Sequence, residues 1–485
     1  MADSTTAAAA PAKAAWIGLM LGPLLLLACL LSTPPAGLSD TAWAAVGLTL
    51  LMATWWSTEA IPIPATSLLP ILLIPALGID SLNAATAPYA NPTIYLFLGG
   101  FILGLAMERW NLHKRIALMT LLAVGNQPSR QIAGFMLATA FLSMWVSNTA
   151  TTIMMLPIGL SVIALLAGER DAGDSERERF ATALLLAIAY AASVGGIATL
   201  IGTPPNALLA AFLAENYDVQ IGFGQWMLIG LPVSILMLAF IWWWLTRGGF
   251  RLSGHDSGEL IRSELADLGP LSRGEKLVAL VFVLTALAWV LQPLIAQQIP
   301  GVNDTSIAIA AALALFIIPV DAKRRVFLMN WESAGKLPWG VLLLFGGGLS
   351  LAGVIRSTGL AEWIAQSLGA LSVLPVLAMI GVVVLVIIFL TEVTSNTATA
   401  AAFLPLLGAL AVAQGMPAEL LAIPAAIAAS CAFMMPVATP PNAIVFGTGH
   451  MRIQSMIKAG FALNLIGVVL VTLVSYLLVG LIWSH

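Results

Sequence analysis

The sequence predicts an all-α polytopic membrane protein in which two repeats of inverted topology each contain a re-entrant helical hairpin and a broken helix. Three observations lead to this fold class: the composition, the placement of the basic residues, and a set of motifs that occurs twice. Of the 485 residues, 60% are hydrophobic and only 9% are charged. Soluble domains carry about a quarter charged residues, so this chain cannot cover a water-facing surface. Its two cysteines, Cys29 and Cys431, lie in separate apolar runs and suit neither a disulfide framework nor a zinc site.

About 20 consecutive apolar residues form a helix that crosses a bilayer, and about 11 transmembrane helices are expected in total. Nine segments are typical of simple spans: 16–34, 42–57, 64–79, 94–108, 226–246, 275–297, 305–320, 339–361 and 457–483. Four further apolar stretches do not fit a single crossing: 131–168, 182–214, 373–413 and 420–450. The first and third are too long for one crossing and too short for two with a connector. The second and fourth are each interrupted by a Pro-Pro pair.

The basic residues indicate which loops share one side of the membrane. Loops without any Lys or Arg are expected outside the cell: 35–41, 80–93, 215–225, 292–306, 366–375 and 414–419. By the positive-inside rule, the cytoplasmic side holds the basic positions Lys13, Arg109, Lys114, Arg115, Arg130, Arg170, Arg177, Arg179, the 247–276 loop, 323–325, Lys336, Arg452 and Lys458. Arg356 is the one expected exception. The N-terminus is therefore predicted to be cytoplasmic and the C-terminus external.

These assignments divide the chain into five parts. They are a disordered cytoplasmic tail, an N-terminal transmembrane helix, a first inverted repeat, a cytoplasmic linker and a second inverted repeat, at residues 1–14, 15–41, 42–246, 247–276 and 277–485.

The same polar triplet occurs in two of the long stretches. "SNTAT" followed by "LP" spans 147–157 and again 395–405. The first copy is flanked by Arg130 and Arg170, so both ends of its stretch are expected in the cytoplasm. The second copy is flanked by loops without a basic residue, so both of its ends are expected outside. Each stretch is therefore predicted to be a re-entrant hairpin, and the two tips should meet near the middle of the membrane.

A second duplicated motif predicts a pair of broken helices. "GTPPNAL" at 202–208 matches "ATPPNAI" at 438–444. Prolines remove backbone donors and break a helix, and the residue before a proline avoids the helical region. Each half also has a Gly-rich helix before its hairpin, at 95–109 and 342–356. Inverted repeats with discontinuous helices are typical of secondary transporters, in which free carbonyls bind cations and helix N-termini face anions.

The same motifs also occur in proteins of other functions. A single Ser-Asn-Thr triplet is usually a contact between helices, but two copies in the same order favour a binding site. An intramembrane enzyme would use Ser147 or Ser395 as its nucleophile, yet neither hairpin holds a His or Lys base. A channel is the other alternative. The absence of a Walker A motif excludes an ATP-hydrolysing domain in this chain.

The segment "WWSTEAIPIPATSLLP" at 55–70 is interpreted as structural. Glu392, an acid within a membrane segment, is expected to matter for function.

The composition of the central segments indicates how an anion would be neutralised. No Lys or Arg occurs at 131–169, 180–246 or 357–451. An anion bound there would have to be balanced by mobile cations, and oxygen-only ligands suit a hard ion such as Na⁺.

Together, "WWSTEAIPIPATSLLP" and the paired "SNTAT…LP" and "TPPN" motifs resemble the divalent anion:sodium symporter family, the INDY-type di- and tricarboxylate transporters, from about residue 42 to the C-terminus. The resemblance implies a homodimeric secondary transporter of the bacterial plasma membrane that works by an elevator motion. It implies Na⁺-coupled uptake of C4 dicarboxylates, two or more Na⁺ sites, no enzymatic activity and no nucleic-acid partner. Citrate or sulfate as the substrate, and Na⁺-independent exchange, remain open alternatives.

The resemblance also implies roles for individual residues. One Na⁺ site would be formed by Ser143, Ser147, Asn148 and Gly202, and the other by Thr391, Thr394, Asn396 and Ala438. Thr394 stands where some relatives have alanine, but its carbonyl can serve either way. The substrate carboxylates would be held by Asn148, Thr149, Thr203, Ser395, Asn396, Thr397 and Thr439.

Overall fold

The computed structural model describes residues 12–125, 127–167, 174–250, 257–367 and 374–483. Within these ranges the regular elements are helices apart from one short antiparallel hairpin, formed by β1 (Pro319–Asp321) and β2 (Val326–Phe327). The predicted all-α class is confirmed. The predicted tail at 1–14 lies outside the described residues except for 12–14, which belong to the first helix.

The described part holds eight helices that are long and apolar enough to cross a membrane, or nine if a bent pair counts as one span. The bent pair consists of α14 (Arg273–Val290) and α15 (Gln292–Gln298), which meet at 78°. Four shorter apolar helical segments also occur: Ile63–Ala76, Asp304–Ile317, Val376–Thr391 and Glu419–Ala429. Several predicted spans are thus helices too short to cross a bilayer by themselves.

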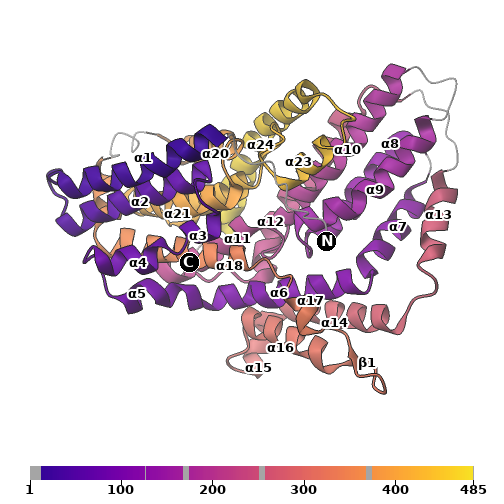
Figure 1. The fold of residues 1–485 in the computed structure, drawn as a ribbon, viewed down its shortest axis with the longest axis horizontal. Helices are drawn as coiled ribbons and strands as arrows, with labels where there is room; N and C mark the ends of the chain where they lie inside the picture. The colour runs from indigo at the N-terminus through magenta and orange to yellow at the C-terminus, as the bar shows by residue number, and fades with distance from the viewer. Residues whose placement is uncertain (1–11, 126, 168–173, 251–256, 368–373, 484–485) are drawn as a thin grey trace.

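The N-terminal region forms one end of the elongated molecule (Figure 1). Its elements are α1 (Ala12–Leu31), α2 (Asp40–Thr58), α3 (Ile63–Thr66), α4 (Leu69–Ala76), α5 (Leu82–Thr86) and η1 (Ala87–Ala90). The predicted span at 64–79 is split into α3 and α4, with Ser67 between them. The Ser67 hydroxyl accepts from Trp56 Nε1 at 3.2 Å, and the Ser67 carbonyl accepts from the Tyr89 hydroxyl. These contacts give the "WWSTEAIPIPATSLLP" segment a structural role.

The two halves of the chain contain the same elements in the same order. The first half has α6 (Pro92–Arg109), α7 (Leu112–Val124), α8 (Pro128–Ser143), α9 (Asn148–Ala167), α10 (Asp174–Ile197), α11 (Pro204–Tyr217) and α12 (Phe223–Thr246). The second half has α18 (Trp339–Ser357), α19 (Leu360–Ser367), α20 (Val376–Thr391), α21 (Asn396–Ala413), α22 (Glu419–Ala429), α23 (Pro440–Phe446) and α24 (Ile453–Ile482). The duplication read from the motifs therefore extends to whole supersecondary units.

The two halves are interlocked at their centre. Each hairpin packs on the first piece of its own broken helix, so that α8 and α9 contact α10, and α20 and α21 contact α22. The second piece crosses over, because α11 contacts α21 and α23 contacts α9. Helices α12 and α24 also pack against each other. The hairpin tips are thereby held by both halves at once.

A separate group of elements connects the halves, consisting of α13 (Ser257–Asp267), α14, α15, α16 (Asp304–Ile317), the β-hairpin and α17 (Trp331–Ala334). In Figure 1, α14–α16 and β1 lie below α6. The predicted linker at 247–276 contains α13, and α14 begins inside it. A Cβ at Gly99 of α6 would lie 2.7 Å from the Cβ of Ala308, so a glycine is needed for the close approach of α6 to α16.

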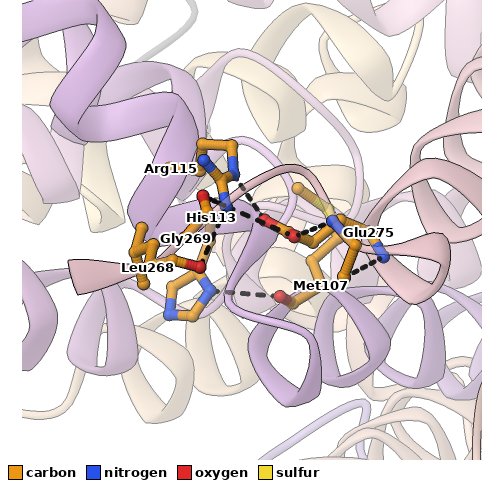
Figure 2. A network of polar contacts seen from close by, with 7 residues as sticks. Met107, His113, Arg115, Leu268, Gly269 and Glu275 are labelled. Carbon is orange, nitrogen blue, oxygen red and sulfur yellow. Dashed lines mark hydrogen bonds and ion pairs between the residues drawn. The ribbon is translucent and has the colours of Figure 1, made fainter. Parts of the chain in front are cut away.

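A buried polar network fixes the linker to the first half (Figure 2). Arg115 of α7 donates from Nε to Glu275 of α14 at 2.5 Å and from Nη2 to the carbonyl of Gly269 at 3.0 Å. Both charged side chains are buried. Removing one partner of a buried pair leaves an uncompensated charge, which costs about 3–5 kcal/mol. The network therefore holds α7 firmly against the turn between α13 and α14.

Candidate functional site

The two Ser-Asn-Thr motifs lie at the tips of helical hairpins, as predicted. In the first hairpin α8 ends at Ser143, residues 144–147 turn, and α9 begins at Asn148. In the second, α20 ends at Thr391, residues 392–395 turn, and α21 begins at Asn396. The triplet thus spans the last turn residue and the first two residues of the returning helix, where backbone N–H groups are unpaired and suit an anion.

At the first tip a single hydroxyl proton faces more than one acceptor oxygen. Ser143 Oγ lies 2.6 Å from Asn148 Oδ1 and 2.6 Å from the carbonyl oxygen of Ala192. The amide atom of Asn148 that faces this cluster also lies 3.1 Å from the Ala192 carbonyl and 3.3 Å from that of Gly202. A hydroxyl has one proton to donate. If the Asn148 amide is turned over, its NH₂ group donates to these oxygens; if its oxygen faces them, a bound cation can balance the cluster.

The second tip repeats this arrangement. Thr391 Oγ1 lies 2.7 Å from Asn396 Oδ1 and 3.0 Å from the carbonyl oxygen of Ala429. A single hydroxyl proton again faces two acceptors. Thr394 is engaged separately, because its hydroxyl donates to the carbonyl of Leu390 at 2.9 Å and lies 2.6 Å from the hydroxyl of Thr399.

The tips differ in how far their polar groups are exposed. Ser147 is exposed, and its hydroxyl accepts from the backbone N–H of Ala150 at 3.2 Å, as a helix cap. Asn148, Thr149, Ser395 and Asn396 are half-buried. Thr397, Thr203 and Thr439 are buried, with 9%, 3% and 5% of their surface exposed. These three therefore form the deeper part of the expected substrate set.

Each broken helix is interrupted next to a hairpin tip. The first break covers residues 198–203, between α10 and α11, and the second covers 430–439, between α22 and α23. Thr203 and Thr439 precede the two Pro-Pro pairs in extended conformations, with φ of −144° and −141°. Proline at the first helical positions is favourable because no N–H is lost there. The residues before proline therefore end each break where the sequence predicted.

The asparagine of each "PPN" motif organises its break. Asn206 Nδ2 lies 2.9–3.3 Å from the carbonyl oxygens of Gly196, Ile197 and Thr199. Asn442 Nδ2 lies 3.2 and 3.1 Å from the carbonyl oxygens of Ala432 and Met435. Both asparagines are completely buried. Sequence reasoning assigned no role to them, although both stand within the quoted motif.

The first break is packed more tightly than the second. A Cβ at Gly202 would lie 2.4 Å from the carbonyl oxygen of Gly196, and one at Gly196 would lie 2.8 Å from that of Gly202. Both positions therefore need glycine. In the second half alanines stand at the matching positions, Ala432 and Ala438.

Two further contacts connect the first half with the break of the second half. Thr203 Oγ1 of the first break lies 3.5 Å from Ser430 Oγ of the second. The Tyr190 hydroxyl of α10 donates to the carbonyl of Phe433 at 2.8 Å. Neither Ser430 nor Tyr190 was singled out by the sequence, because both act through partners that are distant along the chain.

The oxygen atoms that lie closest to the motif asparagines belong to hydroxyl and carbonyl groups. Among the residues that the structure describes, no group of three or more His, Cys, Asp and Glu could hold a metal ion. Two cavities lie away from the tips. One is lined by α7, α9 and α13 around Lys114 and Glu264, and the other lies beside Gly37 and Trp363. Oxygen ligands without a carboxylate cluster or nitrogen suit a hard monovalent cation better than a transition metal.

Comparison with known proteins identifies relatives over almost the whole chain. A family model described as "Sodium:sulfate symporter transmembrane region" matches residues 13–484. The sodium-dependent dicarboxylate transporter SdcS of Staphylococcus saprophyticus is 45% identical over 476 residues, covering 96% of this chain and 91% of that protein. The SdcS protein of Staphylococcus aureus strain USA300 is also 45% identical, over 95% of this chain and 90% of its own length.

Two solved structures are similar in fold. The Alcanivorax borkumensis YdaH transporter, described as having an unusual topology, matches with a TM-score of 0.57 at 15% identity, over 97% of this chain and 98% of its own. The Neisseria gonorrhoeae efflux pump MtrF matches with a TM-score of 0.58 at 12% identity, over 96% of each chain. At these identities the likeness concerns the fold alone.

These relatives are membrane transporters, which confirms the prediction of a multi-pass transporter rather than an enzyme. From the family match and the 45% identity along nearly the whole length, the chain belongs to the sodium:sulfate symporter family, the divalent anion:sodium symporters that its duplicated motifs resemble.

Proposed function

We propose that this protein is a secondary active transporter that couples Na⁺ entry to the uptake of C4 dicarboxylates such as succinate, malate and fumarate. The family assignment supports a symporter, and the names of the relatives at 45% identity support sodium and dicarboxylate as the coupled pair. The bacterial plasma membrane is the proposed location.

The observation that carries this proposal is the duplicated cluster of oxygen atoms at the hairpin tips. In each cluster a hydroxyl oxygen lies within 3.0 Å of both an asparagine amide oxygen and a backbone carbonyl oxygen. We assign one Na⁺ to each cluster, with the ligand sets Ser143, Ser147, Asn148 and Gly202, and Thr391, Thr394, Asn396 and Ala438. The close approach of Gly202 and Ala192 to the Asn148 amide supports the first set.

The dicarboxylate would lie between the two tips. Its carboxylates would accept hydrogen bonds from the residues Asn148, Thr149, Thr203, Ser395, Asn396, Thr397 and Thr439. The N-termini of α9 and α21 begin at the two motif asparagines, so their free N–H groups add favourable positive potential. Asn148 and Asn396 belong to both sets, which would couple cation binding to substrate binding.

Cotransported Na⁺ would offset the negative charge of a dicarboxylate that crosses the membrane. Carrying a dianion into a cell moves two negative charges against the membrane potential, at about 2.3 kcal/mol per charge and 100 mV. The described part of 131–250 and of 374–451 contributes Arg177, Arg179 and Arg247 as its only basic side chains other than histidine. None of these belongs to the tips. Two Na⁺ would make transport electroneutral, and a third would make it electrogenic.

We further infer that the two repeats are inverted in the membrane and that the site moves by an elevator motion in a homodimer. The cytoplasmic N-terminus, external C-terminus and cytoplasmic 247–276 linker follow from the placement of basic residues. Gly249 and Gly415 offer a matched test, since both have positive φ and open space around a new Cβ. In a Cys29- and Cys431-free background, Gly415→Cys should react with an impermeant thiol reagent on intact cells and Gly249→Cys should not. Equal labelling would contradict the topology.

The proposed function is tested by uptake into proteoliposomes with labelled succinate, citrate and sulfate. We expect succinate uptake that requires an inward Na⁺ gradient, with a Hill coefficient above one for Na⁺. Preferred uptake of sulfate or citrate would change the substrate class. Uptake at full rate in choline, driven by dicarboxylate inside the vesicle, would identify an exchanger and refute the sodium coupling.

A further inference from the structure

Glu392 is a buried acid that the ligand sets above leave without a role. It follows Thr391 in the tip of the second hairpin, and only 3% of its surface is exposed. An acid at such a depth is functional by default in a membrane protein. Its surroundings define what that function can be.

The Glu392 carboxylate accepts hydrogen bonds from two other elements. Oε1 accepts from the backbone N–H of Phe433 at 2.7 Å and from Asn464 Nδ2 of α24 at 2.8 Å. Oε2 accepts from the backbone N–H of Met435 at 3.0 Å, and the N–H of Met434 lies within 3.0 Å of both oxygens. Three consecutive amides of the second break thus point at one side chain.

These contacts leave no room for a direct ligand role. A carboxylate has about four lone-pair positions, and five contacts shorter than 3.1 Å already occupy them. Glu392 is therefore saturated by donors from its own chain. It holds the N–H side of residues 433–435, while Asn442 holds the carbonyls of Ala432 and Met435 from the other direction.

The first half holds the matching position by a neutral contact. Met144 follows Ser143 as Glu392 follows Thr391, and Thr199 and Met435 each lie seven residues before the asparagine that binds their carbonyls. In the first half the Thr199 hydroxyl donates to the Met144 carbonyl at 2.5 Å. The same pair of positions is in contact in both halves, but the second half uses a carboxylate.

We propose that Glu392 is a positioning residue for the second Na⁺ site, which fixes the break at 430–439 so that the Ala438 carbonyl is placed for the cation and Thr439 for the substrate. This inference rests on the proposed function, since it assigns a role within the same site. Loss of the carboxylate would loosen the second site and leave the first site intact.

The experiment compares Glu392→Gln with wild type and with Met144→Leu, the matched control in the first half. Glutamine keeps the shape but turns one acceptor into an NH₂ group that faces backbone N–H groups. We expect the Na⁺ concentration for half-maximal uptake to rise roughly tenfold or more, since hydrogen bonds to a charged group are lost. The Hill coefficient for Na⁺ should fall, and the maximal rate at saturating Na⁺ should change much less. Met144→Leu should leave all three quantities unchanged.

Asn464→Ala provides a second variant in case Glu392→Gln does not fold. It removes one donor and leaves the carboxylate on the backbone amides, so a smaller shift in the same direction is expected. A folded Glu392→Gln or Asn464→Ala protein with the Na⁺ dependence of wild type would overturn the inference.

The outcome for wild type separates this inference from the proposed function. If wild type itself transports without Na⁺, the sodium coupling is refuted, and the inference is judged by the half-saturating dicarboxylate concentration. Glu392→Gln should then raise that concentration, because the same break sets the position of Thr439, which is assigned to the substrate. No change in it would overturn the positioning role as well.

Discussion

The two breaks in the broken helices have the same motif but are held in place differently. The first, at 198–203, is compact, with Gly196 and Gly202 in close backbone contact. The second, at 430–439, is longer, carries alanine at both matching positions and is anchored by Glu392. The duplicated residues therefore mark where the two breaks lie. The residues that differ determine how each break is held in place.

The largest effect is expected for Gly202→Ala, which places in the first motif the alanine that the second motif has at Ala438. The new Cβ would lie 2.4 Å from the Gly196 carbonyl oxygen. Overpacking costs up to about 3 kcal/mol, so we expect uptake efficiency to fall by about a hundredfold. Ala438→Gly, the reverse change, adds no atoms and should alter uptake by less than about fivefold. Equal losses from both variants would show that the breaks are packed alike.

The next effect concerns the asparagines that begin the returning helices. Asn148→Ala and Asn396→Ala each remove an amide that lies within 2.7 Å of a hydroxyl in its oxygen cluster. Loss of an interaction with a charged group costs about 1.5–3 kcal/mol, so half-saturating Na⁺ and dicarboxylate should rise roughly ten- to hundredfold. Both constants are measured by uptake in proteoliposomes. Ser161→Ala, an exposed serine farther along α9 that donates to the Pro157 carbonyl, is the control and should have little effect.

These two predictions depend on features that the sequence already contained. The hairpin tips, the start of the helices at Asn148 and Asn396, and the Pro-Pro breaks follow from local rules about proline, capping and repeated motifs. The bent and short helices could not be predicted from these local rules. Helix α7 carries Lys114 and Arg115 and is too short to span a membrane, so the sequence predicted a cytoplasmic loop in its place. The partners of Glu392 lie 41 and 72 residues away, so only tertiary packing could identify them.

A smaller effect is expected for the asparagines inside the breaks. Asn206→Ala removes an amide that contacts three carbonyl oxygens, and Asn442→Ala removes one that contacts two. The Ile197 carbonyl keeps the donor Trp226 Nε1 at 2.9 Å, and the Thr199 and Met435 carbonyls keep backbone donors, so the buried Gly196 and Ala432 carbonyls lose most. An unsatisfied buried group costs about 1–3 kcal/mol, so both variants should be less stable, with Asn206→Ala the more affected. Thermal unfolding of the purified proteins measures this order. If Asn442→Ala were the less stable variant, the second break would depend on its asparagine more than the first break does.

The smallest effect is predicted at the contact between the two breaks. Ser430 and Thr203 are both buried, but their hydroxyls are 3.5 Å apart, at the limit of a hydrogen bond. Ser430→Ala should therefore change half-saturating dicarboxylate by no more than about twofold. Thr203→Val should have a larger effect, because its hydroxyl is also assigned to the substrate. In the double variant the two effects should add, which is expected when residues do not depend on each other. If Ser430→Ala alone weakened binding as strongly as Asn396→Ala, the two breaks would be one coupled structure, and their separate means of support would not act independently.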